Sequence, residues 1–82
     1  MACENFAIVY TKPGCPQCVQ AKTLLTSRNY CIQEKVIGSD VTLNELFEHI
    51  GMQVRSVPQI FITENDTESY VGDYGALVKH LR

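Results

Sequence analysis

The chain has 82 residues, 45% of them hydrophobic and 20% charged, and this length allows one domain, which we expect to span residues 1–82. No apolar segment approaches the length of a membrane span. The net charge is −2 and the seven lysines and arginines are scattered, which argues against binding of a nucleic-acid backbone. The first ten residues, MACENFAIVY, lack the features of a secretion signal, so we expect a cytoplasmic protein.

The first half of the chain predicts a strand, a helix and a second strand. Residues 6–10 (FAIVY) form a short apolar run that is typical of a buried strand. A helix is predicted from Pro16 to about Asn29, since proline suits the first helical position. Its inward side is predicted to carry Val19, Ala21, Leu24 and Leu25. A strand over residues 31–37 completes a β-α-β unit, whose right-handed crossover makes the two strands parallel.

The second half predicts a helix, two antiparallel strands and a final helix. Thr42 and Glu45 form a capping box before an apolar face, and Gly51 is placed to end that helix. Two strands follow, SVPQIFIT and SYV, joined by a turn over ENDTE. The last helix lies within residues 72–82, with Asp73 as its N-cap. The order β-α-β-α-β-β-α predicts an α/β fold with one four-stranded mixed sheet and helices on both faces.

Two of the four cysteines, Cys15 and Cys18, are separated by two residues. A zinc site needs four ligands, usually in two paired clusters, and the chain offers no second pair, so no metal is expected. A single Cys-x-x-Cys beside a β-α-β pattern is typical of a redox pair. The other two, Cys3 and Cys31, lie far from this pair and from each other in the sequence; we expect Cys31 to be a small buried residue and Cys3 to lie near an exposed terminus.

The position of this pair favours reactivity. Cys15 falls at the start of the predicted helix, where free N–H groups and the helix dipole stabilise a thiolate. Cysteines in such positions have pKa values of roughly 3.5 to 7.5, against about 8.5 for a free thiol. Lys12 can add positive charge from the preceding loop. We therefore expect the more exposed Cys15 to attack a disulfide and the more buried Cys18 to resolve the mixed disulfide.

A second landmark is Ser56-Val57-Pro58 at the start of a predicted strand. A proline there removes a ladder donor, which fits a strand start or a sheet edge. If its peptide bond is cis, Val57 can present its N–H and C=O to a ligand or an extended peptide. From the residues alone, a cis bond and a routine turn proline remain open.

Taken together, these segments resemble the glutaredoxin family over nearly the whole chain. The resemblance is carried by YTKPGCPQC, RSVPQIFI and VGDYGAL, in that order and spacing. It implies a thioredoxin-like fold and disulfide exchange with glutathione as the reductant. Cys15 would then be the nucleophile, Cys18 the resolving thiol and Pro58 a cis-proline. The implied glutathione contacts are Lys12 with a carboxylate, Val57 with the cysteinyl backbone, and the N–H groups of Tyr74 and Gly75 with the γ-glutamyl carboxylate.

The chain departs from the family pattern at several positions near the expected glutathione site. Gln17 stands where the family often has tyrosine, and Gly72-Asp73 replaces a Gly-Gly pair. Ala76 replaces an acidic residue that meets the amino group of glutathione. Asp73 either compensates for that loss or repels the nearby carboxylate. Leu43 occupies a commonly polar position, and a longer GMQVRSVP segment places Arg55 beside the groove.

Three functions remain to be separated at this point. The first is reduction of protein disulfides and glutathione mixed disulfides by a monomeric enzyme, with ribonucleotide reductase as a candidate acceptor. The second is the same chemistry with thioredoxin reductase as the electron source, which the resemblance links to Gln17. The third is an iron–sulfur module in which Cys15 from two chains and two glutathiones hold a cluster. Pro16 argues against the third, because cluster-binding members usually carry a smaller residue there.

Overall fold

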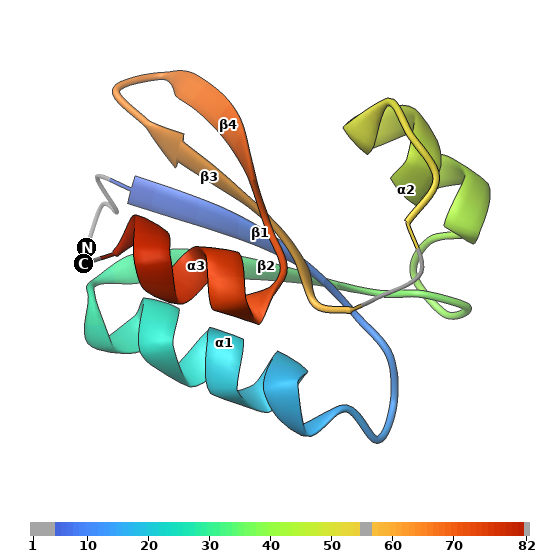
Figure 1. Ribbon diagram of the computed structural model, residues 1–82, viewed down its shortest axis with the longest axis horizontal. Coiled ribbons are helices and arrows are strands. Elements are labelled where there is room, and N and C mark those ends of the chain that lie inside the picture. Colours follow the sequence, from blue (N-terminus) through green and yellow to red (C-terminus); the bar gives the residue numbers. More distant parts are fainter. Residues whose placement is uncertain (1–4, 55–56, 82) are drawn as a thin grey trace.

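The computed structural model describes residues 5–54 and 57–81, and it has the predicted order of elements. The strands and helices are β1 (Asn5–Thr11), α1 (Pro16–Ser27), β2 (Tyr30–Val36), α2 (Leu43–Ile50), β3 (Gln59–Glu64), β4 (Thr67–Gly72) and α3 (Tyr74–His80). Figure 1 shows them as one sheet with α1 and α3 side by side on one face and α2 on the other.

The four strands form one mixed sheet in the order β2-β1-β3-β4. β1 and β2 are parallel, with Phe6 opposite Cys31, as the β-α-β pattern predicts. β3 runs antiparallel to both β1 and β4, and Asn65 and Asp66 make the tight turn between β3 and β4 with positive φ angles. β1 and β3 are therefore the central strands, and β2 and β4 are the edge strands of the sheet.

Each face of the sheet has its own apolar core. The larger core joins the sheet to α1 and α3 and contains Ala7, Val9, Ala21, Leu25, Ile60, Ile62 and Leu77. The smaller core, on the α2 face, is built around Tyr10, Leu46 and Phe61. Successive residues of a strand point to opposite faces, so Val9 and Tyr10 belong to different cores.

Two residues that the sequence placed in the core are exposed. Phe6 is 49% exposed. It is the second residue of β1, and Figure 1 shows the start of β1 lying far from α2, which has only eight residues. Val19 is 58% exposed, since the buried side of α1 consists of Cys18, Ala21 and Leu25. One position along a helix is a rotation of about 100°, which turns Val19 away from the sheet.

The helix ends follow their capping residues. Cys15 is the N-cap of α1, with Pro16 as the first helical residue. Thr42 caps α2 by accepting from the N–H of Glu45, and Gly51 ends it with a φ of 89°, a left-handed conformation that glycine adopts without steric cost. α1 ends at Ser27 instead of Asn29, because the backbone of Asn29 is left-handed with a φ of 66°.

Candidate active site

The two cysteines of the Cys-x-x-Cys motif meet at the start of α1. They are joined as a disulfide, with their Cα atoms 5.3 Å apart. Cys15 is half-buried, whereas Cys18 is only 2% exposed. The N–H of Cys18 donates a hydrogen bond of 3.2 Å to the Sγ of Cys15. One free donor of the first helical turn therefore already points at this sulfur, where it would stabilise negative charge in the reduced form.

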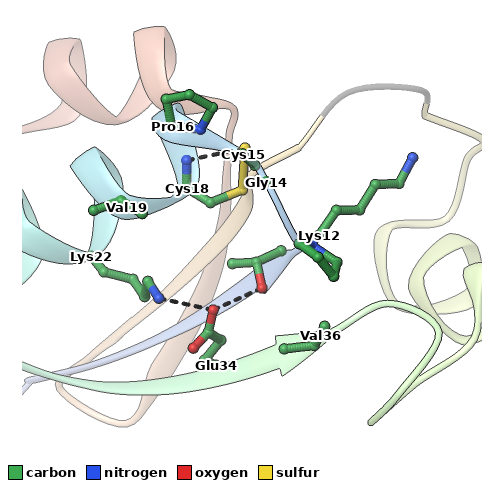
Figure 2. Close-up of a pocket in the computed structure, with 11 residues that line it drawn as sticks. Lys12, Gly14, Cys15, Pro16, Cys18, Val19, Lys22, Glu34 and Val36 are labelled. Atoms are coloured by element: carbon green, nitrogen blue, oxygen red, sulfur yellow. Dashed lines mark hydrogen bonds and ion pairs between the residues drawn. A yellow bond between two sulfur atoms is a disulfide. The ribbon is translucent and has the colours of Figure 1, made fainter.

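The disulfide lies beside a cavity of about 500 Å³ (Figure 2). Its wall next to the sulfurs is formed by Gly14, Cys15, Pro16, Cys18 and Val19, and its other side by residues 11–13, Lys22, Glu34 and Val36. Gly14 has a φ of 74°, which favours glycine, and a side chain added there would meet open space. The loop before α1 thus leaves the approach to the cysteines clear.

A polar group lies across this cavity from the cysteines. The ammonium of Lys22 donates to the carboxylate of Glu34 at 3.0 Å, and the hydroxyl of Thr11 donates to the same oxygen at 2.8 Å (Figure 2). These two hydrogen bonds, that of Lys22 first, lower the pKa of Glu34 below its ordinary value of 4.5. No local pattern in the sequence marks this group, because its members come from α1, β2 and β1 and meet only through the strand register.

The segment before β3 approaches the same sulfur from the other side. The carbonyl oxygen of Val57 lies 3.8 Å from the Sγ of Cys15. The peptide bond between Val57 and Pro58 is cis, and Pro58 is buried immediately before the first residue of β3. A proline just before a central strand removes no donor from the ladder itself, and it leaves the backbone of Val57 beside the disulfide.

Lys12 lines two cavities. It borders the cavity beside the disulfide and a second one of about 240 Å³, which is otherwise lined by Val57 and by apolar side chains of α2 and its flanking segments. Those side chains are Ile37, Leu43, Leu46, Phe47 and Val54. Figure 2 shows the Lys12 side chain extending away from the two sulfur atoms. Its charge is therefore better placed for a bound molecule than for the thiolate.

The remaining expected contact residues do not line either cavity. Gln17 is exposed on the first turn of α1. Asp73 is the N-cap of α3, and its carboxylate accepts from the N–H of Ala76 at 3.0 Å, while Tyr74 and Gly75 begin that helix. α1 and α3 start at the same end of the sheet (Figure 1), so these residues lie on the side of the molecule that carries the disulfide.

Several other expectations concern residues away from this site. The side chain of Cys31 was expected to be buried but is half-buried, because β2 is an edge strand of the sheet. Cys3, Arg55 and Ser56 lie outside the described residues. Within residues 5–54 and 57–81, the structure brings no three His, Cys, Asp or Glu side chains together as a metal-binding group. No helix in that part of the chain is long and apolar enough to span a membrane.

A mixed sheet of this topology with a Cys-x-x-Cys disulfide at the start of its first helix defines a thiol–disulfide oxidoreductase of thioredoxin-like fold. The chain belongs to the glutaredoxin family, whose family model matches residues 7–66.

Curated proteins and a solved structure agree with this membership. The chain is 31% identical to the glutaredoxin of Haemophilus influenzae over 80 residues, covering 90% of this chain and 91% of that protein. It is 39% identical to the glutaredoxin of Vibrio cholerae over 66 residues, covering 72% and 75% of the two chains. The crystal structure of glutaredoxin 1 from Francisella tularensis complexed with cacodylate superposes with a TM-score of 0.71 at 25% identity, covering 94% of this chain and 92% of that chain.

Proposed function

We propose that this enzyme reduces protein disulfides and glutathione mixed disulfides, with Cys15 as the nucleophile, Cys18 as the resolving thiol and glutathione as the reductant. The observation that carries the proposal is the unequal setting of the two sulfurs. Cys15 is half-buried at a cavity mouth and accepts the N–H of Cys18, while Cys18 is 2% exposed. A half-buried sulfur stabilised as an anion suits attack on a large substrate, and a buried neighbour suits internal resolution.

The proposed reaction with a protein disulfide has two exchange steps. The Cys15 thiolate attacks one substrate sulfur, the substrate S–S bond breaks, and the released substrate thiolate takes a proton from water. Cys18 loses its proton to solvent and attacks Cys15, which releases the second substrate thiol and leaves the Cys15–Cys18 disulfide. Two glutathione molecules then reduce this disulfide and leave as oxidised glutathione.

A glutathione mixed disulfide needs only one of the two cysteines. Cys15 attacks the glutathione sulfur and releases the substrate thiol, so that glutathione is now bound to Cys15. A second glutathione attacks that glutathione sulfur, which frees Cys15 and forms oxidised glutathione. In this route Cys18 takes no part, and this difference separates the roles of the two cysteines.

The glutathione contacts are proposed around Cys15. Val57 would bond the cysteinyl backbone of glutathione beside Pro58, because its carbonyl is 3.8 Å from the Cys15 sulfur. Lys12 would pair with a carboxylate, since it is exposed between the two cavities. The N–H groups of Tyr74 and Gly75 would bind the γ-glutamyl carboxylate, with Asp73 near the amino group and Gln17 along the rim.

The proposal also implies a setting and partners. Reduction by glutathione requires a compartment whose thiols are kept reduced, so the proposed location is the cytoplasm. The proposed acceptors are disulfide-containing proteins, with ribonucleotide reductase as one candidate. Residues 1–82 are proposed to act as a single domain and as a monomer.

The deciding experiment compares two electron sources. The purified protein is supplied with a glutathione mixed disulfide and NADPH, together with either glutathione and glutathione reductase or thioredoxin reductase alone. NADPH consumption with glutathione supports the proposal, whereas turnover with thioredoxin reductase alone contradicts it. Brown colour and visible absorption after anaerobic purification would instead support the cluster-binding alternative.

A further inference from the structure

A chain of three hydrogen-bonded side chains crosses the α2 face of the sheet, away from the cysteines. The hydroxyl of Tyr10, in β1, lies 2.7 Å from Nδ1 of His49 in α2. The other ring nitrogen of His49 bonds the carboxylate of Glu68 in β4. The His49 ring is also stacked on Phe61 of β3, with ring centroids 3.7 Å apart and planes inclined by 7°. His49 therefore contacts three strands of the sheet at once.

The direction of these hydrogen bonds depends on which ring nitrogen of His49 carries the proton. Burial raises the pKa of Tyr10 above its ordinary value of 10.0, and the charges of Glu68 and Glu45 raise it further. The hydroxyl therefore keeps its proton at neutral pH and can donate it to Nδ1. In a neutral His49 the ring proton is then on Nε2, which donates to Glu68. One tautomer satisfies both bonds.

This chain of bonds joins α2 to β1 and β4 beside the apolar contacts of the helix. The fully buried residue of the helix is Leu46, which packs against Tyr10 and Phe61, so Leu46 and His49 hold the helix on the same part of the sheet. Figure 1 shows α2 standing alone on its face, whereas α1 and α3 pack side by side on the opposite one. The half-buried Phe47 and Ile50 pack against the same cluster, so the contacts that orient α2 are concentrated around Tyr10 and Phe61.

One side of α2, here called the α2 wall, borders a cavity that Val57 and Lys12 also line. Leu43, Leu46 and Phe47 line the cavity of about 240 Å³ whose other side contains Lys12 and Val57. The carbonyl of Val57 is in turn 3.8 Å from the Cys15 sulfur. A rotation or shift of α2 would therefore change the shape of a cavity that adjoins the reacting atom.

We propose that His49 is a positioning residue for disulfide substrates: through Tyr10 and Glu68 it fixes the orientation of α2, and thereby the cavity beside Val57 that receives the part of a substrate flanking its disulfide. The inference rests on the proposed role of Cys15 as the attacking sulfur. It does not require glutathione to be the physiological reductant. The proposed role of His49 predicts different effects on two kinds of substrate. Small disulfides reach only Cys15, whereas larger ones also contact the α2 wall.

The test compares two disulfides in single turnovers of the fully reduced protein. Hydroxyethyl disulfide is the small probe and oxidised glutathione is the larger one. His49→Leu should raise the half-saturating concentration of oxidised glutathione on the order of tenfold, which is one decade of affinity. The maximal rate and the reaction with hydroxyethyl disulfide should stay unchanged, as expected for loss of binding alone.

Matched variants separate positioning from stability. Leu24→Ala removes a half-buried side chain from the opposite core, and it should lower the unfolding temperature without changing either probe's kinetics. His49→Asn can keep a bond to Tyr10 only, and His49→Gln can keep one to Glu68 only, so each should fall between wild type and His49→Leu. Tyr10→Phe combined with His49→Leu should add little to His49→Leu alone.

A readout without catalysis keeps the proposal testable if the roles of the cysteines are wrong. In the oxidised protein, His49→Leu should speed hydrogen exchange of the α2 amides while those of α1 and α3 stay protected. If His49→Leu fails to fold, the same measurements on His49→Asn decide. The proposal would be overturned if hydrogen exchange of the α2 amides did not change. It would also be overturned if the variant were less stable than wild type but had the same half-saturating concentration of oxidised glutathione. Loss of the proposed function would appear separately, as a Cys15→Ser protein that still reduces hydroxyethyl disulfide.

Discussion

The N–H of Cys18 donates a hydrogen bond to the sulfur of Cys15 across the first turn of α1, at 3.2 Å. The more exposed of the two sulfurs, at the edge of the cavity, is thus the one that the helix start would stabilise as an anion in the reduced protein. The buried sulfur, in contrast, belongs to Cys18, the residue whose backbone N–H donates this hydrogen bond. This division of roles leads directly to the first prediction.

Replacement of each cysteine should have a different effect. Cys15→Ser should reduce all disulfide exchange to background, because no thiolate remains at the cavity mouth. Cys18→Ser should lose reduction of protein disulfides but keep reduction of glutathione mixed disulfides, which needs only Cys15. Steady-state assays with both substrate types check this. An equal loss in the two variants would mean that the roles are wrongly assigned.

Removal of the Lys12 charge should act mainly on binding. Lys12→Ala should raise the KM for glutathione about two- to fivefold, as expected for an exposed ion pair worth up to about 1 kcal/mol. Because its side chain extends away from the sulfurs, the alkylation profile of Cys15 against pH should move only slightly upward (Figure 2). Lys79→Ala, an exposed change on α3, is the control. A large shift of the profile with an unchanged KM would reverse this assignment.

The Lys22–Glu34 pair should contribute stability only at higher pH. The folded-state pKa of Glu34 is below its ordinary value of 4.5, so its contribution is fully present above that value and disappears as the pH falls through the folded pKa. Lys22→Met should therefore lower the free energy of unfolding by less than about 1 kcal/mol at neutral pH, since the pair is partly exposed. The difference should decrease as the pH falls below 4.5 and vanish in acid, below the folded-state pKa of Glu34.

Urea unfolding of both proteins at neutral pH and in acid measures this effect. Lys79→Met serves as the control, because it removes an equal charge from an exposed position on α3. A Lys22→Met effect of the same size at both pH values would show that the lost stability comes from packing of the lysine stem.

The N-cap of α2 should be worth about 1 kcal/mol. The hydroxyl of Thr42 accepts from the N–H of Glu45 at 3.2 Å, so Thr42→Ala should lower the free energy of unfolding by that amount. Thr42→Ser should restore most of it, since serine offers the same acceptor. Glu48→Ala, on the exposed side of the same helix, should have little effect. Equal losses for Thr42→Ala and Thr42→Ser would contradict a capping role.

The order of elements could be predicted because its signals are local. Pro16 marks a helix start, Gly51 marks a helix end, and the capping box at Thr42 is complete within four residues. The burial of single side chains was harder to predict. Val19 is apolar but faces solvent, because the inward side of α1 depends on where the helix meets the sheet and not on composition.

The candidate site was predictable where one segment carries it. Cys15 and Cys18 are neighbours in sequence, and their motif defines them. The Thr11–Glu34–Lys22 group and the bonds of His49 were not predictable, because each joins side chains from three elements. The contacts of His49 depend on the register of β1, β3 and β4, which no local pattern specifies.

β4 has a consequence beyond the active site. It is six residues long, its first four residues are exposed, and among the described strands it pairs only with β3. The backbone groups on its open side are free to recruit a strand from another molecule, which is a common route to aggregation. Glu68 places a negative charge in this strand, where identical copies would repel one another. The carboxylate that bonds His49 would thus also set like charges against each other if two copies of β4 were paired.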